Sequence, residues 1–216
     1  MGINQSLTAR MALIGQGING AMANPDIMNR LKDFGYTEEK MTAGKTLFDQ
    51  TQVEVIAHKK EYGEQYSAYE VVEKLWEPIQ NAYKQTRDLC RIGLKNKVGA
   101  LHSLRATGSR SRSIAGFIKD ARILYTNLME QAEYLQTMNG FGISKEKLTT
   151  DLEAIQQLET AYQNYLKERG EAQDSTVKRD RLLDSLYDWY SDFRAVTRIA
   201  LADNPQLMEG LGVVVK

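Results

Sequence analysis

The sequence predicts an all-α protein, and three observations carry this prediction. Between residues 37 and 200 the chain is rich in Ala, Leu, Glu, Lys, Gln and Arg, which favour helices, and the whole chain holds only three prolines. Its apolar residues recur at steps of three, four and seven, which is the period of an amphipathic helix. The chain also matches itself, which indicates two copies of one helical unit.

The apolar spacing is clearest in two segments. After Thr37, apolar residues recur every seventh position, at Met41, Phe48, Val55 and Tyr62. The segment that begins at residue 114 has one apolar stripe with helical spacing, formed by Ile114, Phe117, Ile118, Ala121, Leu124, Tyr125 and Leu128. Only the tail, 213–215, has a strand-like composition. Helices are therefore expected along almost the whole chain.

The self-match pairs residues 34–94 with residues 141–201 without a gap, at a distance of 107 positions. Of these 61 positions 16 are identical, whereas random pairing at ordinary composition would give roughly four. Thr37 and Ser144 are candidate N-caps, and each follows a Phe-Gly that is able to end the preceding helix. We interpret the match as an ancient tandem duplication.

The duplication predicts a six-helix bundle built from two tandem three-helix repeats. The first repeat would span 1–104 and the second 114–216, joined by a Gly- and Ser-containing connector at 105–113. Gly63 and Gly170 occupy the same position in each repeat, and we expect a helical hairpin that turns near each glycine. The alternative is an elongated, coiled-coil-like rod whose long helices continue through both glycines, because the seven-residue spacing keeps its register past them.

Charge and cysteine content exclude several classes of protein. The chain has 28 basic and 28 acidic residues, so net charge gives no argument for nucleic acid or an acidic membrane as a partner. Cys90 is the only cysteine, which excludes an intrachain disulfide and zinc-finger spacings, and we expect a buried thiol. No apolar run approaches the length of a membrane span, and no secretion signal is recognisable. A cytoplasmic location is the default expectation.

The two histidines do not form a recognisable metal or catalytic motif. A di-metal site in a bundle needs Glu-x-x-His on two helices, and no such motif exists. His58 falls on the apolar spacing and matches Tyr165 in the second repeat, so we expect a residue at the core or its boundary. His102 is expected near a helix end. We therefore predict no cofactor, no metal and no enzymatic activity.

A duplicated Tyr-x-x-x-Arg-x-x-x-Arg motif is the most distinctive polar feature. Residues at steps of four along a helix form one slanting ridge beside the apolar stripe. The structural interpretation is that each arginine packs its stem and pairs with carboxylates of a neighbouring helix. The functional interpretation is a pair of anion sites or ridges that grip a partner. The two candidate ridges are Tyr83, Arg87 and Arg91, and Tyr190, Arg194 and Arg198.

The connector contains a basic, serine-rich run with Arg105, Arg110 and Arg112. Basic side chains without neighbouring aromatic rings are a weak signal for nucleic acid, because single strands are bound by stacking as well as by charge. We expect a solvated loop, with weak nucleic-acid contact as the alternative.

These observations predict a non-enzymatic helical-bundle protein that acts as a self-assembling, scaffold or protein-interaction module. Its partner would be itself, as a homo-oligomer, or another protein. Eleven tyrosines exceed what a six-helix core needs, and interfaces favour this residue. The alternatives are a binder of a small anionic ligand or cofactor between the two repeats, and weak contact with nucleic acid through the connector.

Overall fold

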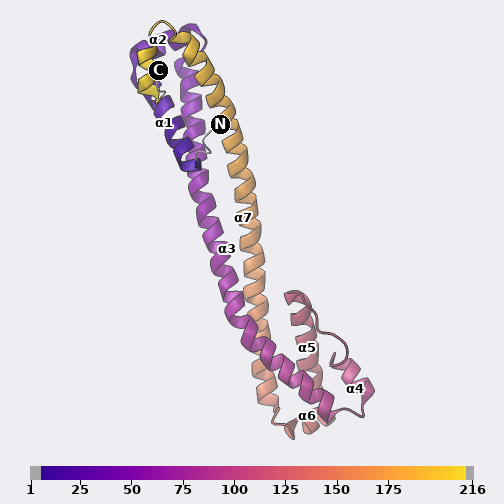
Figure 1. Ribbon diagram of the computed structural model, residues 1–216. Coiled ribbons are helices and arrows are strands. Elements are labelled where there is room, and N and C mark those ends of the chain that lie inside the picture. The colour runs from indigo at the N-terminus through magenta and orange to yellow at the C-terminus, as the bar shows by residue number, and fades with distance from the viewer. Residues whose placement is uncertain (1–5, 213–216) are drawn as a thin grey trace. The chain divides into compact units, whose positions relative to one another are not determined.

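The protein is all-α in the computed structural model, which describes residues 6–212 (Figure 1). These residues form seven α-helices and one 3₁₀ helix, and no strand occurs among them. In chain order they are α1 Leu7–Ala23, α2 Pro25–Asp33, α3 Glu38–Gly93, α4 Val98–Ser103, α5 Ile114–Glu130, α6 Ala132–Asn139, α7 Lys145–Ala200 and the 3₁₀ helix η1 Pro205–Leu211. Across this part of the chain, no helix is both long and apolar enough to cross a membrane. The strand-like tail at 213–215 lies outside the described residues.

The chain divides into two compact units. Unit 1 combines the residues up to 61 with those from 172 onward, and unit 2 comprises residues 62–171. Each unit has its own hydrophobic core. The division of the sequence into repeats at 1–104 and 114–216 concerns the origin of the chain and stays a prediction.

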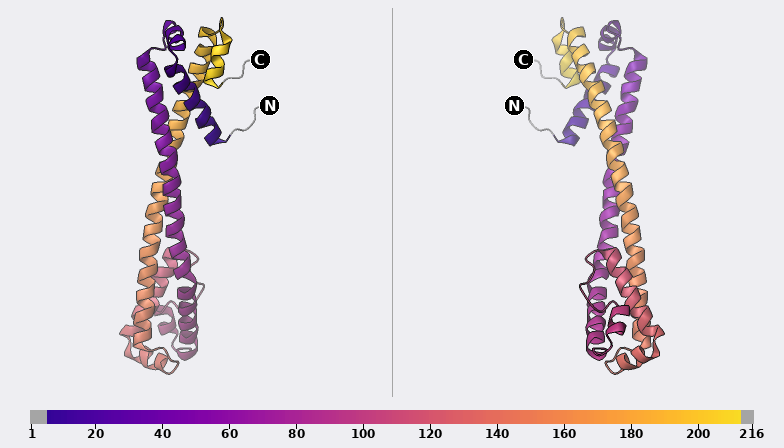
Figure 2. Two further views of the ribbon diagram at one scale, coloured as in Figure 1. Left: turned by 90° about the vertical axis from the view of Figure 1, so that its left-hand side faces the viewer. Right: turned by 90° about the vertical axis from the view of Figure 1, so that its right-hand side faces the viewer.

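Unit 1 is built from α1, α2, the first half of α3, the second half of α7 and η1. The two long segments run antiparallel, since Tyr36 lies 5.7 Å from the ring of Phe193 while His58, further along, contacts Thr176. Figure 2 shows α1 crossing this part of α7. The core includes Ile14, Ile18, Ile27, Leu31, Tyr36, Met41, Phe48, Leu186, Phe193 and Leu201.

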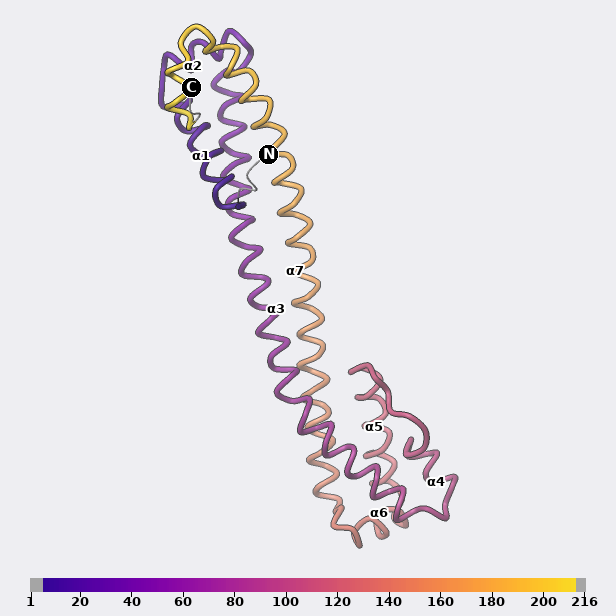
Figure 3. The backbone as a smooth tube through the Cα atoms, in the orientation of Figure 1, coloured from indigo at the N-terminus to yellow at the C-terminus, as the bar shows by residue number. Residues whose placement is uncertain are grey.

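Unit 2 is built from the second half of α3, α4, α5, α6 and the first half of α7. Here Trp76 and Tyr83 of α3 pack edge-on against Phe117 of α5, at 4.8 and 5.1 Å between ring centroids. In Figure 3 the backbone loops from α4 to the start of α5. The core includes Val72, Tyr83, Cys90, Leu94, Leu104, Phe117, Leu124, Tyr125, Leu128, Leu148, Ile155 and Leu158.

Corresponding elements of the two halves begin 107 residues apart throughout. This holds for α1 and α5, for α2 and α6, for α3 and α7, and for α4 and η1. Both α3 and α7 contain 56 residues. The sequence match covers only 34–94 and 141–201, so the structure extends the correspondence to α1, α2, α4 and their counterparts. The correspondence supports the tandem duplication inferred from the sequence.

The loops that precede the long helices are built alike and confirm the expected caps. Gly35 and Gly142 have φ of +81° and +76°, the left-handed conformation that glycine adopts without strain. The Thr37 hydroxyl oxygen accepts a hydrogen bond from the Lys40 amide, and that of Ser144 accepts one from Lys147, each at 3.3 Å. These side chains satisfy amides that the first helical turn leaves free.

The prediction of a helical hairpin at Gly63 and at Gly170 is wrong. The prediction of six helices is also wrong, since the described residues form seven α-helices and one 3₁₀ helix. Both α3 and α7 pass through these glycines as single helices, which was the alternative prediction. A glycine in a helix costs only about 1 kcal/mol relative to alanine, too little to break a helix whose two ends are both held in a core. Figure 3 shows both traces coiling without interruption.

Replacing Gly63 or Gly170 by alanine should therefore stabilise the protein by roughly 0.5–1 kcal/mol each, because alanine removes the entropic cost of a helical glycine. An added Cβ would meet no other atom within 4 Å at either position. Urea unfolding followed by circular dichroism measures the change. Gly44→Ala is the matched control, since its Cβ would lie 2.0 Å from Trp189, and it should destabilise by about 1–3 kcal/mol. Destabilisation by Gly63→Ala would contradict a continuous helix.

Candidate functional site

The first arginine ridge lies inside unit 2, near the end of α3. Tyr83 and Arg87 are buried, with exposed fractions of 1% and 4%. The ring of Tyr83 packs edge-on against Phe117, and burial lowers the pKa of the Arg87 guanidinium below its ordinary value. A buried arginine needs hydrogen-bond acceptors around its planar group.

Backbone carbonyl groups supply these acceptors. Arg87 donates to the carbonyl oxygens of Arg105 at 3.2 Å, Thr107 at 3.0 Å and Gly108 at 2.7 Å. Arg91 donates to those of Ala106 at 2.6 Å and Gly108 at 3.3 Å. The two guanidinium groups therefore hold the start of the connector, which follows α4, along the surface of α3. Carbonyl groups take the place of the carboxylates expected from the sequence, apart from one exposed pair of Arg91 with Asp88 at 3.3 Å.

The three connector arginines have different environments. Arg105 has a φ of +52° and its guanidinium pairs with the buried carboxylate of Asp120 at 3.2 Å. Arg110 and Arg112 are exposed and line a surface pocket of about 360 Å³ together with Phe117. All three side chains are exposed, and Arg105 differs from the other two because it pairs with a buried carboxylate and so fixes the loop.

The second arginine ridge lies in unit 1, near the end of α7, and its arginines are not enclosed. The hydroxyl of Tyr190 donates to the carbonyl oxygen of Leu13 at 3.2 Å, which anchors the ridge to α1. Arg194 lies over the Tyr190 ring at 6.0 Å. Arg194 and Arg198 are exposed and line a surface pocket of about 270 Å³, together with Tyr187, Tyr190, Ser191 and Ala195.

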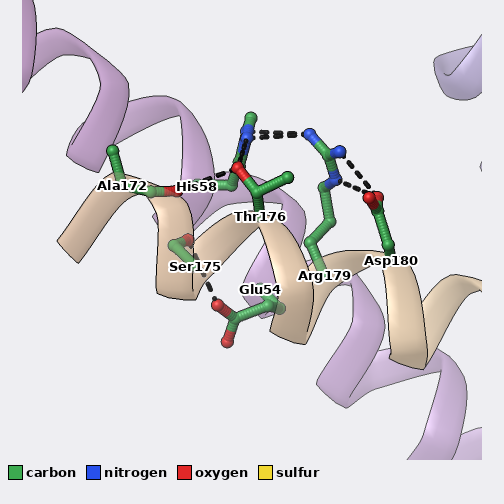
Figure 4. Close-up of polar contacts among 7 residues, drawn as sticks. All are labelled: Glu54, His58, Ala172, Ser175, Thr176, Arg179 and Asp180. Carbon is green, nitrogen blue, oxygen red and sulfur yellow. Dashed lines mark hydrogen bonds and ion pairs between the residues drawn. The ribbon is translucent and has the colours of Figure 1, made fainter. Parts of the chain in front are cut away.

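A cluster of polar side chains also crosses between α3 and α7 within unit 1, and Figure 4 shows it. Glu54 is buried, accepts a hydrogen bond from the Ser175 hydroxyl at 3.4 Å and pairs with the Lys178 ammonium at 2.5 Å. His58 lies beside it, and its Nε2 is 2.8 Å from the Arg179 guanidinium and 3.2 Å from the Thr176 hydroxyl. This cluster was not predicted from the sequence, although Glu54, next to the apolar stripe, was a signal for it.

His58 is half-buried, as its place on the apolar spacing predicted. Its pKa lies below the ordinary value of 6.5, first because burial disfavours the charged ring and second because of the Arg179 cation. The carboxylates of Asp180 and Glu54 oppose this effect. The second histidine, His102, is exposed near the end of α4. The single cysteine, Cys90, is buried, and burial raises the pKa of its thiol to about 12.

Comparisons with protein families, with curated proteins and with solved structures find no match to this chain. The two arginine ridges of the chain differ in what their guanidinium groups contact. One holds a segment of the connector, and the other faces a surface pocket.

Arg87→Met should destabilise the protein by about 2–4 kcal/mol, because it removes the three hydrogen bonds by which a buried guanidinium holds the connector. Arg194→Met, at the equivalent position of α7, should change stability by less than about 0.5 kcal/mol, because the side chain is exposed. Urea unfolding measures both changes. Trypsin should also cleave the connector of the Arg87→Met protein faster. Equal costs for the two substitutions would refute the difference between the ridges.

The low pKa of His58 predicts a pH-dependent contribution to stability. Between the folded and unfolded pKa values the unfolded chain binds more protons, so this contribution is complete above about pH 6.5 and declines as the pH falls. The difference in unfolding free energy between the wild-type protein and His58→Gln should therefore shift against the wild type from pH 8 to pH 5. A constant difference over this range would exclude His58 as the source.

Proposed function

We propose that this protein is a non-enzymatic helical interaction module that self-associates as a scaffold. The observation that carries the proposal is a set of exposed apolar side chains that are identical at equivalent positions. Phe34 and Phe141 are 50% and 41% exposed, and Ile92 and Ile199 are 58% and 62% exposed. Within each pair the residue numbers differ by 107.

Burial within the chain does not explain these two identities. Leu94 and Leu201 are identical and both are buried, so core packing accounts for them. Other exposed apolar residues of the long helices have polar counterparts. Val53 corresponds to Thr160, and Val177 corresponds to Glu70. Retention of the same apolar residue at two exposed positions is best explained by contact with another molecule.

Each unit carries one such phenylalanine and one such isoleucine. In unit 2, Phe141 lies across the end of α3, where its Cε2 atom is 2.8 Å from the place of a Cβ on Gly93, the residue after Ile92. In unit 1 the corresponding residues are Phe34 and Ile199, next to the ends of α2 and α7. With one apolar surface on each unit, a chain is able to contact two other chains, so that assembly need not stop at a dimer.

The double variant Phe34→Ser, Phe141→Ser tests this proposal. Light scattering over a range of concentrations should show the wild-type mass rising above the 24.5 kDa of one chain. The double variant should associate at least about tenfold more weakly, because two buried aromatic contacts are lost per interface.

Val53→Thr with Val177→Glu is the matched control, since each substitution introduces the residue that the other half already carries. This control should associate like the wild type. A wild-type protein that keeps the mass of a single chain at every concentration would refute self-association.

A further inference from the structure

The connector between α4 and α5 carries a pocket that the proposed self-association does not use. Its volume of about 360 Å³ lies at the lower end of the range for small-molecule sites. The residues that line it, all of unit 2, are Gln80, Arg110, Ser111, Arg112 and Phe117. They supply two guanidinium groups, one hydroxyl and one amide, and none of them is acidic. The lining is therefore positively charged.

Neighbouring carboxylates do not neutralise this charge. Asp120 pairs with Arg105 at 3.2 Å, and Asp88 pairs with Arg91 at 3.3 Å. Within the part of the chain that the structure describes, the two arginines of the pocket make no hydrogen bond or ion pair. Two cationic groups with unused donors in one pocket favour the binding of an anion.

Other cations add to the same positive field. Burial lowers the pKa of the Arg87 guanidinium, and the cations of Arg91 and Arg110 lower it further, so these three side chains lie close enough to repel one another. Tyr83 and Asp88 oppose this effect. A negative charge bound beside Arg110 would relieve the repulsion, because unlike charges attract at the same short range.

Ser111 is placed at the first turn of α5, where Gly116 leaves room for it. A Cβ on Gly116 would overlap the hydroxyl oxygen of Ser111. Ser113 caps the helix by accepting a hydrogen bond from the Gly116 amide at 3.1 Å, and its Oγ lies 3.5 Å from that of Ser111. Ser111 therefore adds a hydroxyl donor at the end of α5 where the helix dipole favours negative charge.

We propose that Arg110, Ser111 and Arg112 bind the terminal phosphate group of a small phosphate monoester. Such a group carries up to two negative charges and three acceptor oxygens, which match two planar guanidinium groups and one hydroxyl donor. The pocket exceeds a phosphate group in volume, and the amide of Gln80 is able to hydrogen-bond a hydroxyl group of the ligand. A hydroxylated ester, of the sugar phosphate class, therefore fits better than inorganic phosphate.

Nucleic acid fits this pocket less well. Proteins bind single strands by stacking bases on aromatic rings as well as by charge. The ring in the wall of the pocket, Phe117, is only 2% exposed and packs edge-on against Trp76 and Tyr83. This ring is not free to stack on a base, so the pocket favours a monoester over the nucleic acid considered from the sequence.

Isothermal titration calorimetry of the full chain with ribose 5-phosphate tests the proposal. At low ionic strength the wild-type protein should bind this probe with a dissociation constant of about 1 mM or below. Arg110→Gln with Arg112→Gln should weaken binding at least about tenfold, because both charged donors are lost. Arg169→Gln with Arg181→Gln is the matched control, since it removes the same charge from exposed positions of α7 and should bind like the wild type. Circular dichroism verifies that each variant keeps its fold.

Gly116→Ala tests the position of Ser111 without a change of charge. The added Cβ would displace the Ser111 hydroxyl, so the affinity for ribose 5-phosphate should fall by about three- to tenfold. The helix should tolerate this substitution, because Ala9 occupies the equivalent position of α1 and donates its amide to the Ser6 cap in the same way.

The proposal is overturned if the wild-type protein shows no saturable binding of ribose 5-phosphate, or if either variant of the pocket binds it as tightly as the wild type. It is also overturned if inorganic phosphate or a single-stranded oligonucleotide binds as tightly as ribose 5-phosphate. The Phe34→Ser, Phe141→Ser variant should bind the probe like the wild type, so a loss of self-association is distinguishable from a loss of this site.

Discussion

The structure depends on one constraint, which is that each 56-residue helix is shared between two hydrophobic cores. An α-helix of this length spans about 84 Å, far more than one core of a small domain covers. Met41 and Phe48 of α3 therefore belong to the core of unit 1, while Val72 and Tyr83 of the same helix belong to the core of unit 2. Since α7 behaves in the same way, each unit combines the beginning of one half of the chain with the end of the other.

Because each unit combines segments from both halves of the chain, the two identical Tyr-x-x-x-Arg-x-x-x-Arg motifs have different surroundings. The end of α3 is followed by a chain that must continue to α5, and Arg87 and Arg91 hold the first residues of that connection. The end of α7 is followed by η1, and no further helix comes after η1 among the described residues. The arginines of α7 line an open pocket. The same motif therefore holds a segment of the chain in one unit and lines a surface pocket in the other.

Local features of the fold were predictable because local chemistry determines them. The helical class follows from composition and spacing, and the caps at Thr37 and Ser144 follow from their own hydroxyl groups. The burial of His58 was also predictable from its place in the stripe. The hydrogen-bond partners of Arg87 and Arg91 were not predictable, because they are backbone carbonyl groups, which every residue has. The sequence also did not predict which segments form each unit, because apolar periodicity does not show which half of α3 packs against which half of α7.

The polar cluster explains why the hairpin at Gly63 does not form. In a hairpin, Glu54 would face Ala68, the residue equivalent to Ser175, and its buried carboxylate would lose both the hydroxyl and Lys178. Leaving a buried charge unpaired costs about 3–5 kcal/mol. In the observed fold Glu54 meets Ser175, whereas Tyr69 meets Tyr165 at 5.2 Å between ring centroids. The continuous helices therefore allow both the Glu54–Ser175 and the Tyr69–Tyr165 pair, and these contacts favour them over a turn at either glycine.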